Sequence, residues 1–434
     1  MAHRCPDPLP ANRDENASAA ACEDRFVVPS PLPRLRLSLD FMPSPDPDRP
    51  GLLIRDPFRF SDSMLLIPPP LVPCLECFDG QQTSLDLRAN LVQITGEIQV
   101  GEMEKQLYDA LSEAGFLEDA TFEQLRSARI GEFAAAEKRE ASHAGSAYPN
   151  DATEARKTLA EFMQGATPPS GDSLIGIAAP HVSPFGGWES YRDAYSALLP
   201  SYRDRTFVVL GTSHYGEPDR FGLTRKPFVT PFGETIPDVS LVDELASAAP
   251  GAIRMEDYCH AVEHSIEFQV LFLQHIYGPD IRILPILCGS FARSIYEGGK
   301  PEANEQVQRF FGSLGEIAAR EEERLFWVLG VDMAHMGRRY GDSSPARADE
   351  GMMAAVAVRD RSRIDSVNQG DADGFWNQIQ ENRDDLKWCG SSPIYTFLKT
   401  APQARGTLQR YQQWNIDQQS VVSFAALVFH KSRG

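Results

Sequence analysis

The segment Leu325-Phe-Trp-Val-Leu-Gly-Val-Asp-Met-Ala-His335 joins a short apolar run to a turn that carries an acid and a histidine. Its first five residues have the length and composition of a buried strand. Two other runs end in the same way, because Ser173 to Ala179 leads into His181 and Thr206 to Leu210 leads into His214. In an open α/β sheet the loops at the carboxyl ends of the strands face one crevice, so these three loops are predicted to converge.

Residues 139–434 alternate between strand-like and helix-like patterns. The helix-like segments are Trp188 to Leu199, Glu263 to Tyr277, Asn304 to Glu323, Ala346 to Gln369 and Ala372 to Asp384. A further strand-like run, Ile281 to Leu287, follows the second of them. This alternation predicts an α/β fold with a mainly parallel sheet that helices cover on both faces.

The amino-terminal part has a different composition. Residues 1–50 are rich in Pro, Asp and Arg with little apolar periodicity, so they are predicted to form a disordered tail. A small domain is predicted for residues 51–120, and a helical connector for residues 121–138. The small domain is expected to contain two strands, Leu52 to Arg55 and Met64 to Ile67, followed by three helices, Leu71 to Phe78, Ser84 to Thr95 and Glu102 to Ala114.

The formal net charge of -19 is spread along the chain, and the densest basic cluster, Arg359-Asp-Arg-Ser-Arg363, is interrupted by an acid. Phosphate backbones and anionic lipids require clustered cations, so neither nucleic acid nor a membrane is an expected partner. We find no apolar run near the roughly 20 residues that span a bilayer, and no signal peptide. Seven scattered cysteines suit a reducing compartment, so a cytoplasmic protein is predicted, with Cys74 and Cys77 in a core.

Six motifs occur in an order that is typical of one protein family. They are Arg139-Glu-Ala-Ser-His-Ala-Gly-Ser-Ala-Tyr148, Ala179-Pro-His181, Leu210-Gly-Thr-Ser-His214, Glu263-His-Ser-Ile-Glu267, His335-Met-Gly337 and Cys389-Gly-Ser-Ser-Pro-Ile394. Together they resemble the Memo family (protein B of the AmmeMemoRadiSam system), a relative of the class III, or LigB-type, extradiol dioxygenases. The resemblance runs from about Arg139 to the carboxyl terminus, where Ser420 to Ala426 is similar to the family's final strand.

A looser resemblance concerns the amino-terminal domain. Two strands followed by three helices, with Asp79-Gly80 and Gly115 at the breaks, are similar to the small winged-helix domain of PqqD-like proteins. Those proteins hold peptide substrates for partner enzymes. A generic helical accessory domain remains the alternative interpretation.

The Memo resemblance implies that His181, His214 and Cys389 bind one transition metal ion. Imidazole binds Fe(II), copper, zinc and nickel, and a thiolate makes the centre softer, so Fe(II) or copper is the expected cofactor. In the related dioxygenases a carboxylate takes the place of Cys389, and Asp332 would be the substitute ligand. Cys389 also precedes a predicted helix start, where backbone donors stabilise a thiolate. Taken singly, each of these residues has a structural interpretation as a buried core group.

Four further residues are candidates for acid/base catalysis. His335 is predicted to move a proton near the metal, and Asp332 to fix the tautomer of its ring. Glu263 and His264 have two interpretations. They form either a second acid/base or substrate-orienting pair, or a helix cap in which Glu263 favours the positive end of a helix.

The chain departs from the family pattern directly after His181. The usual Ala-Gly-Tyr is replaced by Val182-Ser183-Pro184, which removes a flexible residue and a phenol close to the metal. Trp188 or Tyr191 is expected to fill the space. The identity of the substrate therefore does not follow from the resemblance.

Three functions are compatible with these residues. The first is a non-haem iron or copper redox enzyme, similar to the extradiol dioxygenases, that acts on an unknown and possibly peptide-linked substrate. The second is a non-enzymatic module whose pocket receives a peptide or a partner, and the third is a metal-dependent hydrolase. The family resemblance also implies a radical SAM enzyme and an AMMECR1-like protein as partners. Whether the chain is an enzyme at all remains open at this point.

Overall fold

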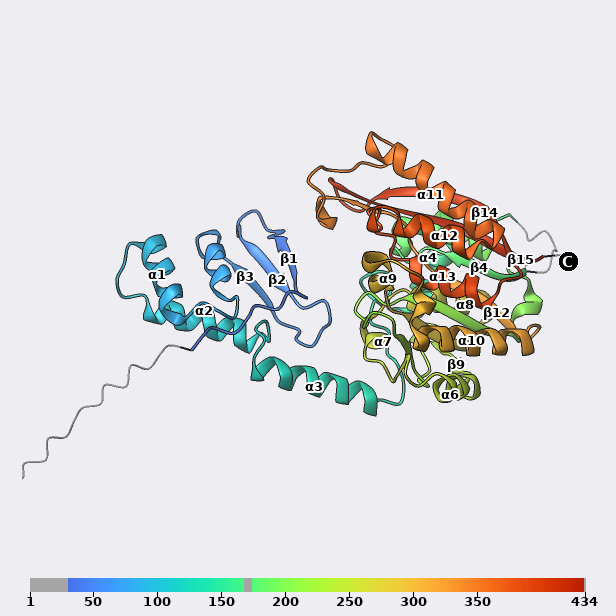
Figure 1. Cartoon of the computed structure of the whole chain (residues 1–434), viewed down its shortest axis with the longest axis horizontal. Coiled ribbons are helices and arrows are strands. Elements are labelled where there is room, and N and C mark those ends of the chain that lie inside the picture. Colours follow the sequence, from blue (N-terminus) through green and yellow to red (C-terminus); the bar gives the residue numbers. More distant parts are fainter. Residues whose placement is uncertain (1–29, 168–173, 433–434) are drawn as a thin grey trace, which may run out of the picture. The chain divides into compact units, whose positions relative to one another are not determined.

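The computed structural model of the chain describes residues 30–167 and 174–432. Two compact units are present (Figure 1). The described residues of the first lie within Met1–Ile54 and Met64–Asp119, and the second comprises Arg55–Ser63 and Ala120–Gly434. No helix among the described residues is long and apolar enough to cross a membrane.

A ten-stranded sheet forms the centre of the second unit, in the order β10-β6-β11-β5-β12-β4-β15-β13, with β14 paired to β15 and β9 to β11. The strands are β4 (Leu174–Ala179), β5 (Thr206–Thr212), β6 (Phe221–Leu223), β9 (Ile236–Pro237), β10 (Ile253–Met255), β11 (Arg282–Cys288), β12 (Leu325–Gly330), β13 (His335–Gly337), β14 (Ala404–Asn415) and β15 (Ser420–Lys431). The central strands β11, β5, β12 and β4 are parallel, and β15 runs antiparallel to β4. The predicted α/β fold with a mainly parallel sheet is confirmed.

Helices cover both faces of this sheet because successive strand residues point to opposite sides. In β5, Val208 and Leu210 belong to one core and Phe207 and Val209 to the other. The first core is completed by α6 (Val239–Ala248), α10 (Glu305–Arg320), α11 (Met352–Gln369), α12 (Ala372–Gln380) and α13 (Ser391–Thr400). The second is completed by α4 (Ala152–Phe162), α5 (Pro184–Tyr195) and α8 (Glu267–Tyr277). The short helices α7 (Cys259–Val262) and α9 (Ala292–Glu297) lie in connections.

The carboxyl-terminal hairpin extends beyond the predicted last strand. β15 continues to Lys431, and eleven residues of β14 pair with it from Ala404 to Asn415, with one irregularity between Leu408 and Arg410. β14 was not predicted, because few of its side chains are apolar and nearly all of its residues are exposed or half-buried. In Figure 1, α11 lies along this hairpin.

The first unit contains β1 (Asp40–Pro43), β2 (Leu52–Arg55) and β3 (Met64–Ile67) in one small antiparallel sheet. A 3₁₀ helix, η1 (Pro69–Cys77), replaces the first predicted α-helix, and α1 (Ser84–Thr95) and α2 (Gly101–Glu113) follow. Cys74 and Cys77 are fully buried in its core.

The prediction of a disordered tail is wrong for residues 30–50, and residues 1–29 lie outside the described residues. Pro31 forms a β-bridge with Thr83 and Leu35 forms one with Leu117. Leu32 and Leu39 are buried in the core of the first unit. These partners lie far along the chain, so local composition could not reveal them.

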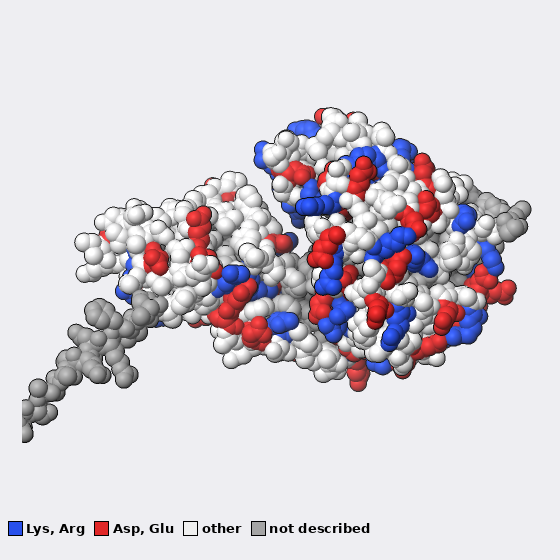
Figure 2. Space-filling view, viewed as in Figure 1, with Lys and Arg blue, Asp and Glu red and all other residues white. Residues whose placement is uncertain are grey.

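The predicted connector at residues 121–138 corresponds largely to α3 (Ala120–Ala135), which belongs to the second unit together with Arg55–Ser63. Within that unit Phe60 stacks on Tyr258, with 5.0 Å between ring centroids, and the Tyr258 hydroxyl donates a hydrogen bond to the carbonyl of Phe58. The loop between β2 and β3 therefore contributes an aromatic layer to the second unit. On the face shown in Figure 2, acidic and basic side chains are interspersed over that unit.

Candidate metal centre

The carboxyl ends of three adjacent parallel strands place the predicted site residues together. β12 lies between β4 and β5, with Gly330 opposite both Ala179 and Gly211. His181 and His214 follow β4 and β5 within three residues, and Asp332 and His335 follow β12. The predicted convergence of these loops is therefore what the structure shows.

His181 is held by the loop after β12. Its Nδ1 lies 2.9 Å from the carbonyl oxygen of Gly330, which can only accept, so Nδ1 carries the proton and Nε2 is left as an acceptor. Its backbone N–H donates to Asp332 Oδ1 at 2.9 Å. Burial of the ring, reinforced by the nearby His214 and His264, keeps the pKa of His181 well below its ordinary value. A neutral imidazole with a free Nε2 is the form that binds a metal ion.

Glu263 holds the loop that carries His214. Its carboxylate lies 3.0 and 3.1 Å from His214 Nδ1 and accepts the backbone N–H groups of His214, His264 and Ser265. The same carboxylate lies 3.1 Å from His264 Nδ1. Burial acts to lower the pKa of His214, but the Glu263 carboxylate and Cys389 outweigh it and hold that pKa well above its usual range. Glu263 is thus a buried acceptor that orients two imidazoles.

The helix-cap interpretation of Glu263 is wrong. The residue directly follows α7, in extended backbone, and α8 begins at Glu267 with Ile266 at its N-cap. The predicted helix start at Glu263 is four residues early because the Glu263 side chain takes the N–H groups of the next two residues into its own turn.

Cys389 precedes α13, whose N-cap is Gly390, as the sequence predicted. The Gly390 N–H donates to the carbonyl of Asp332 at 3.0 Å, and a Cβ on Gly390 would lie 2.5 Å from that oxygen. The close approach seats Cys389 Sγ 3.2 Å from His181 Nε2. Burial raises the pKa of the Cys389 thiol while His214 opposes the rise, so the helix start alone does not produce a thiolate.

The three predicted ligands fit a transition metal ion. One donor atom each from His181, His214 and Cys389 lies within 4.8 Å of the other two. Both imidazoles have Nδ1 engaged by the protein, which leaves Nε2 for the centre, and two imidazoles with one sulfur suit iron, copper or zinc. A second group, His214, Glu263 and His264, is equally compact. The Glu263 carboxylate already accepts several N–H groups, so we infer that Glu263 orients the metal ligands and is not itself a ligand.

Asp332 and His335 lie beside these ligands. Asp332 is buried, its Oδ1 accepts from the backbone of His181 and Val182, and its Oδ2 lies 3.4 Å from His181 Nε2. Burial raises the Asp332 pKa, although His335 and those N–H groups act against the rise. His335 Nδ1 contacts the carbonyls of Met333 and Lys387, which again leaves Nε2 free. Burial lowers the pKa of His335 to about 4, so the ring is a neutral proton acceptor at pH 7.

Two further imidazoles line the site. The His264 ring lies 5.2 Å from the ring of His181 and 5.0 Å from that of His214. The His143 ring lies 5.5 Å from that of His264, and its Nδ1 lies 3.3 Å from the buried Glu267. His143 was not predicted as a site residue, although it lies within one of the six family motifs. A histidine within a motif shared with other site histidines was the signal that could have identified it.

The segment after His181 builds an apolar wall. Val182 packs with Val422 and Phe424, and Tyr340, Trp414 and Ile416 pack against these three. Of the two residues expected to fill the space of the missing phenol, Tyr191 contacts the segment after His181 and Trp188 packs on another helix. Trp188 stacks on Phe162, and Tyr191 is buried against Phe272 with its hydroxyl bonded to the carbonyl of Val182. Tyr340, whose ring centroid is 4.9 Å from that of His335, places a phenol beside that imidazole.

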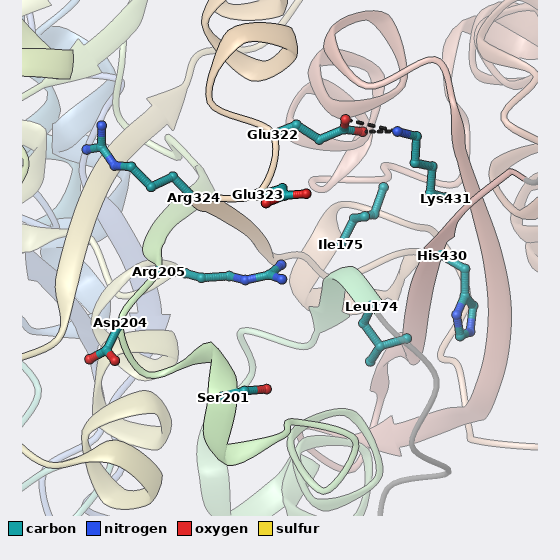
Figure 3. A pocket seen from close by; sticks show the side chains of 10 residues that line it. All are labelled: Leu174, Ile175, Ser201, Asp204, Arg205, Glu322, Glu323, Arg324, His430 and Lys431. Atoms are coloured by element: carbon teal, nitrogen blue, oxygen red, sulfur yellow. Dashed lines mark hydrogen bonds and ion pairs between the residues drawn. The ribbon is translucent and has the colours of Figure 1, made fainter.

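An open pocket of about 900 Å³ lies at the opposite edge of the sheet (Figure 3). Leu174 and Ile175 at the start of β4 and His430 and Lys431 at the end of β15 contribute to it, together with Arg205. Lys431 pairs there with Glu322 at 2.7 Å. None of the predicted site residues lines this pocket.

Comparison with known proteins identifies the family. A model for Memo-like proteins matches residues 139–428. A MEMO1 family protein from Aquifex aeolicus is 25% identical over 382 residues, which cover 87% of this chain and 96% of the relative. One from Thermus thermophilus is 31% identical over 245 residues, covering 56% of this chain and 68% of the relative, and one from Desulfurococcus amylolyticus is 26% identical over 308 residues, covering 68% and 99%.

The Aquifex alignment covers more of the chain than residues 139–434 contain, so it also includes part of the amino-terminal unit. The family model alone spans more than half of the chain, and its matched residues contain the three candidate ligands and the histidines around them. The chain therefore belongs to the Memo-like protein family.

Proposed function

We propose that this chain is a metal-dependent redox enzyme that binds one Fe(II) or copper ion through Nε2 of His181, Nε2 of His214 and Sγ of Cys389. One observation carries the proposal. The two imidazoles have Nδ1 fixed by Gly330 and Glu263, and their remaining nitrogens and the cysteine sulfur share one small volume. The Nε2 of His181 faces Cys389 Sγ at 3.2 Å and Asp332 Oδ2 at 3.4 Å, and both of these groups belong to the same candidate centre.

A bound iron or copper ion would supply one-electron chemistry and a site for O2 that no side chain provides. The residues of the chain supply the proton chemistry. His335 is neutral at pH 7 and has a free Nε2, so it can accept a proton from a substrate hydroxyl. Tyr340 lies beside this ring, and Val182, Val422 and Phe424 exclude water from one side. An apolar or aromatic group, free or on a peptide, suits such a wall.

The partners implied by the family resemblance are part of the proposal. A radical SAM enzyme and an AMMECR1-like protein would act with this chain on a shared, possibly peptide-linked substrate. The amino-terminal unit is the candidate docking element for such a peptide, because a PqqD-like domain would hold it.

Elemental analysis of protein purified without oxygen tests the metal assignment. We expect one iron or copper per chain, with a large loss in His181→Ala, His214→Ala and Cys389→Ser and full retention in His335→Ala. Oxygen uptake with catechols and tyrosine-containing peptides then tests for turnover. Metal binding without any turnover would favour the peptide-binding module, and hydrolysis without oxygen uptake would favour the hydrolase. If the parent protein bound no transition metal after anaerobic reconstitution, the proposal would be refuted.

A further inference from the structure

Asp360 is a buried carboxylate that the proposed chemistry does not use. It lies on α11, with no exposed surface, and accepts three hydrogen bonds from side chains. Trp388 Nε1 donates to Oδ1 at 2.7 Å, and the hydroxyls of Tyr411 and Ser423 donate to Oδ2 at 2.7 and 2.6 Å. Burying a carboxylate costs free energy of desolvation. The residues that donate to Asp360 connect it to the loops of the candidate metal centre.

The first donor leads to Cys389. Trp388 directly precedes it and is 1% exposed. Its backbone N–H donates to Asp384 Oδ2 at 2.9 Å, and the guanidinium carbon of Arg363 lies 5.2 Å from the centre of its indole. With the indole N–H on Asp360, the residue before the sulfur is fixed at its backbone, at its ring face and at its ring edge.

The second donor leads to the loop after β12. Ser423 Oγ accepts the backbone N–H of Ala334 at 2.9 Å, and its own proton goes to Asp360. Its backbone pairs with the same loop, since Ser423 N–H donates to the Ala334 carbonyl and Met333 N–H donates to the Ser423 carbonyl. Ala334 lies between Asp332 and His335, so Asp360 reaches this loop through a single side chain.

We propose that Asp360 is a positioning residue that sets the placement of Cys389 relative to the loop carrying Asp332 and His335. The inference rests on the proposed function, because it concerns the geometry of the same centre. The two loops touch each other directly through Gly390 N–H on the Asp332 carbonyl and His335 N–H on the Leu386 carbonyl. Asp360 adds a second connection, because its Oδ1 accepts from Trp388 and its Oδ2 accepts from Ser423, which binds the loop after β12.

Only a side chain that accepts hydrogen bonds at both of its terminal atoms, such as a carboxylate, completes this arrangement. The indole nitrogen of Trp388 can only donate. Ser423 Oγ already accepts from Ala334, and the Tyr411 hydroxyl already accepts from Gln413 Nε2 at 3.0 Å, so both have their protons free for Asp360. An asparagine would direct its amide N–H groups at one of these sides. Asp360→Asn is therefore a nearly isosteric change that disturbs one of the two branches.

Titration with Co(II) measures the geometry apart from turnover, because a cobalt–thiolate bond gives a charge-transfer absorption band that should disappear in Cys389→Ser. We expect Asp360→Asn to weaken Co(II) binding roughly 10- to 100-fold, the range seen when outer partners of metal ligands are removed, and to shift or weaken the band. Trp388→Phe and Ser423→Ala each remove one branch and should change the band as well, which keeps the test valid if Asp360→Asn folds poorly.

Asp238→Asn is the matched control. Asp238 is also a buried carboxylate, 4% exposed, and accepts from Thr206 Oγ1 and Arg324, but it lies at the other end of β5. The Asp238→Asn variant should be less stable than the parent protein but should keep the parental cobalt–thiolate band and Co(II) affinity. Parental affinity and spectrum in Asp360→Asn, Trp388→Phe and Ser423→Ala would overturn the positioning role. A parent protein without any Cys389-dependent cobalt band would instead overturn the proposed function itself.

Discussion

Replacing Glu263 by Gln tests whether the histidines of the centre are oriented by one buried carboxylate. Glu263 is 1% exposed, and its two oxygens receive the backbone N–H groups of His214, His264 and Ser265 as well as His214 Nδ1. Burial alone would raise its pKa, but His214 and His264 hold the pKa well below the ordinary value, so the group is a carboxylate. Gln has the same shape but offers one acceptor oxygen.

The size of the effect follows from which donors lose their acceptor. In the better orientation the Gln oxygen replaces Oε1, which serves His264, Ser265 and His214 Nδ1. The amide nitrogen then faces the His214 backbone N–H, and one partly buried donor without an acceptor costs about 1–3 kcal/mol. Loss of charge assistance in the remaining bonds adds about 1 kcal/mol. We therefore expect the free energy of unfolding to fall by roughly 2–4 kcal/mol and metal affinity to fall roughly 10- to 100-fold.

Urea unfolding and competitive metal titration measure the two effects separately. Glu244→Gln is the control, since this glutamate is 41% exposed and pairs with Arg320 on the surface, where an ion pair contributes about 0–1 kcal/mol. If Glu263→Gln bound metal as tightly as the parent protein, whatever its stability, Glu263 would not orient the metal-binding histidines. A purely structural role for Glu263 would lower stability and leave affinity unchanged.

Three further predictions concern the surroundings of the centre. His335→Gln should retain the metal and lose turnover by at least about 100-fold, the usual contribution of a general base, and a loss of bound metal in this variant would make His335 a ligand. Glu267→Gln should destabilise the protein by about 3–5 kcal/mol at pH 7 because Arg139 and Glu267 form a fully buried ion pair. Although burial would raise it, the Glu267 pKa is lowered well below its ordinary value by Arg139 and His143. The contribution of the ion pair is therefore fully present above about pH 4.5 and is lost progressively as the pH falls below that value, so the gap in unfolding free energy between parent and variant should narrow steadily on acidification, and a constant gap would contradict this. Phe60→Ala should lower the stability of the second unit by about 3–5 kcal/mol, since Phe60 is 8% exposed and packs on Tyr258 and Phe122, and a thermal melt unchanged within error would show that this aromatic layer is not part of its core.

The strands that carry the site were predictable because each is buried on both faces and ends in a polar turn. β4, β5, β11 and β12 coincide with apolar runs, and each is almost entirely buried. Once these runs were interpreted as strands of one open α/β sheet, the convergence of His181, His214 and His335 followed, because the loops at the carboxyl ends of such strands face one crevice. Local periodicity likewise predicted both ends of α1 and, within one residue, the starts of α10 and α12, while the predicted ends of α10 and α12 lay too far along the chain.

What could not be predicted depends on partners that are distant in sequence. The segment at residues 30–50 folds because Leu32 and Leu39 find a core built by later helices. α8 begins four residues after its predicted start because the Glu263 side chain accepts the backbone N–H groups of His264 and Ser265, which the predicted helix would have included in its first turn. The role of Asp360 depends on contacts with residues 28, 51 and 63 positions away. Neither pattern nor spacing contains this information.

In all five histidines of the site, Nδ1 faces an acceptor of the protein. His181 and His335 present Nδ1 to backbone carbonyls, whereas His143, His214 and His264 present Nδ1 to the buried carboxylates of Glu267 and Glu263. Because a carbonyl or carboxylate of the protein contacts Nδ1 in every case, Nε2 is the nitrogen that remains for a metal ion or a substrate. The acceptor affects more than orientation, since a carboxylate stabilises the protonated ring more strongly than a carbonyl does. Burial lowers the pKa of His181 and of His335, and their carbonyl acceptors offset this effect only in part, whereas the Glu263 carboxylate and Cys389 outweigh burial at His214 and raise its pKa. Replacing these acceptors should therefore change the function of a histidine that is itself left in place.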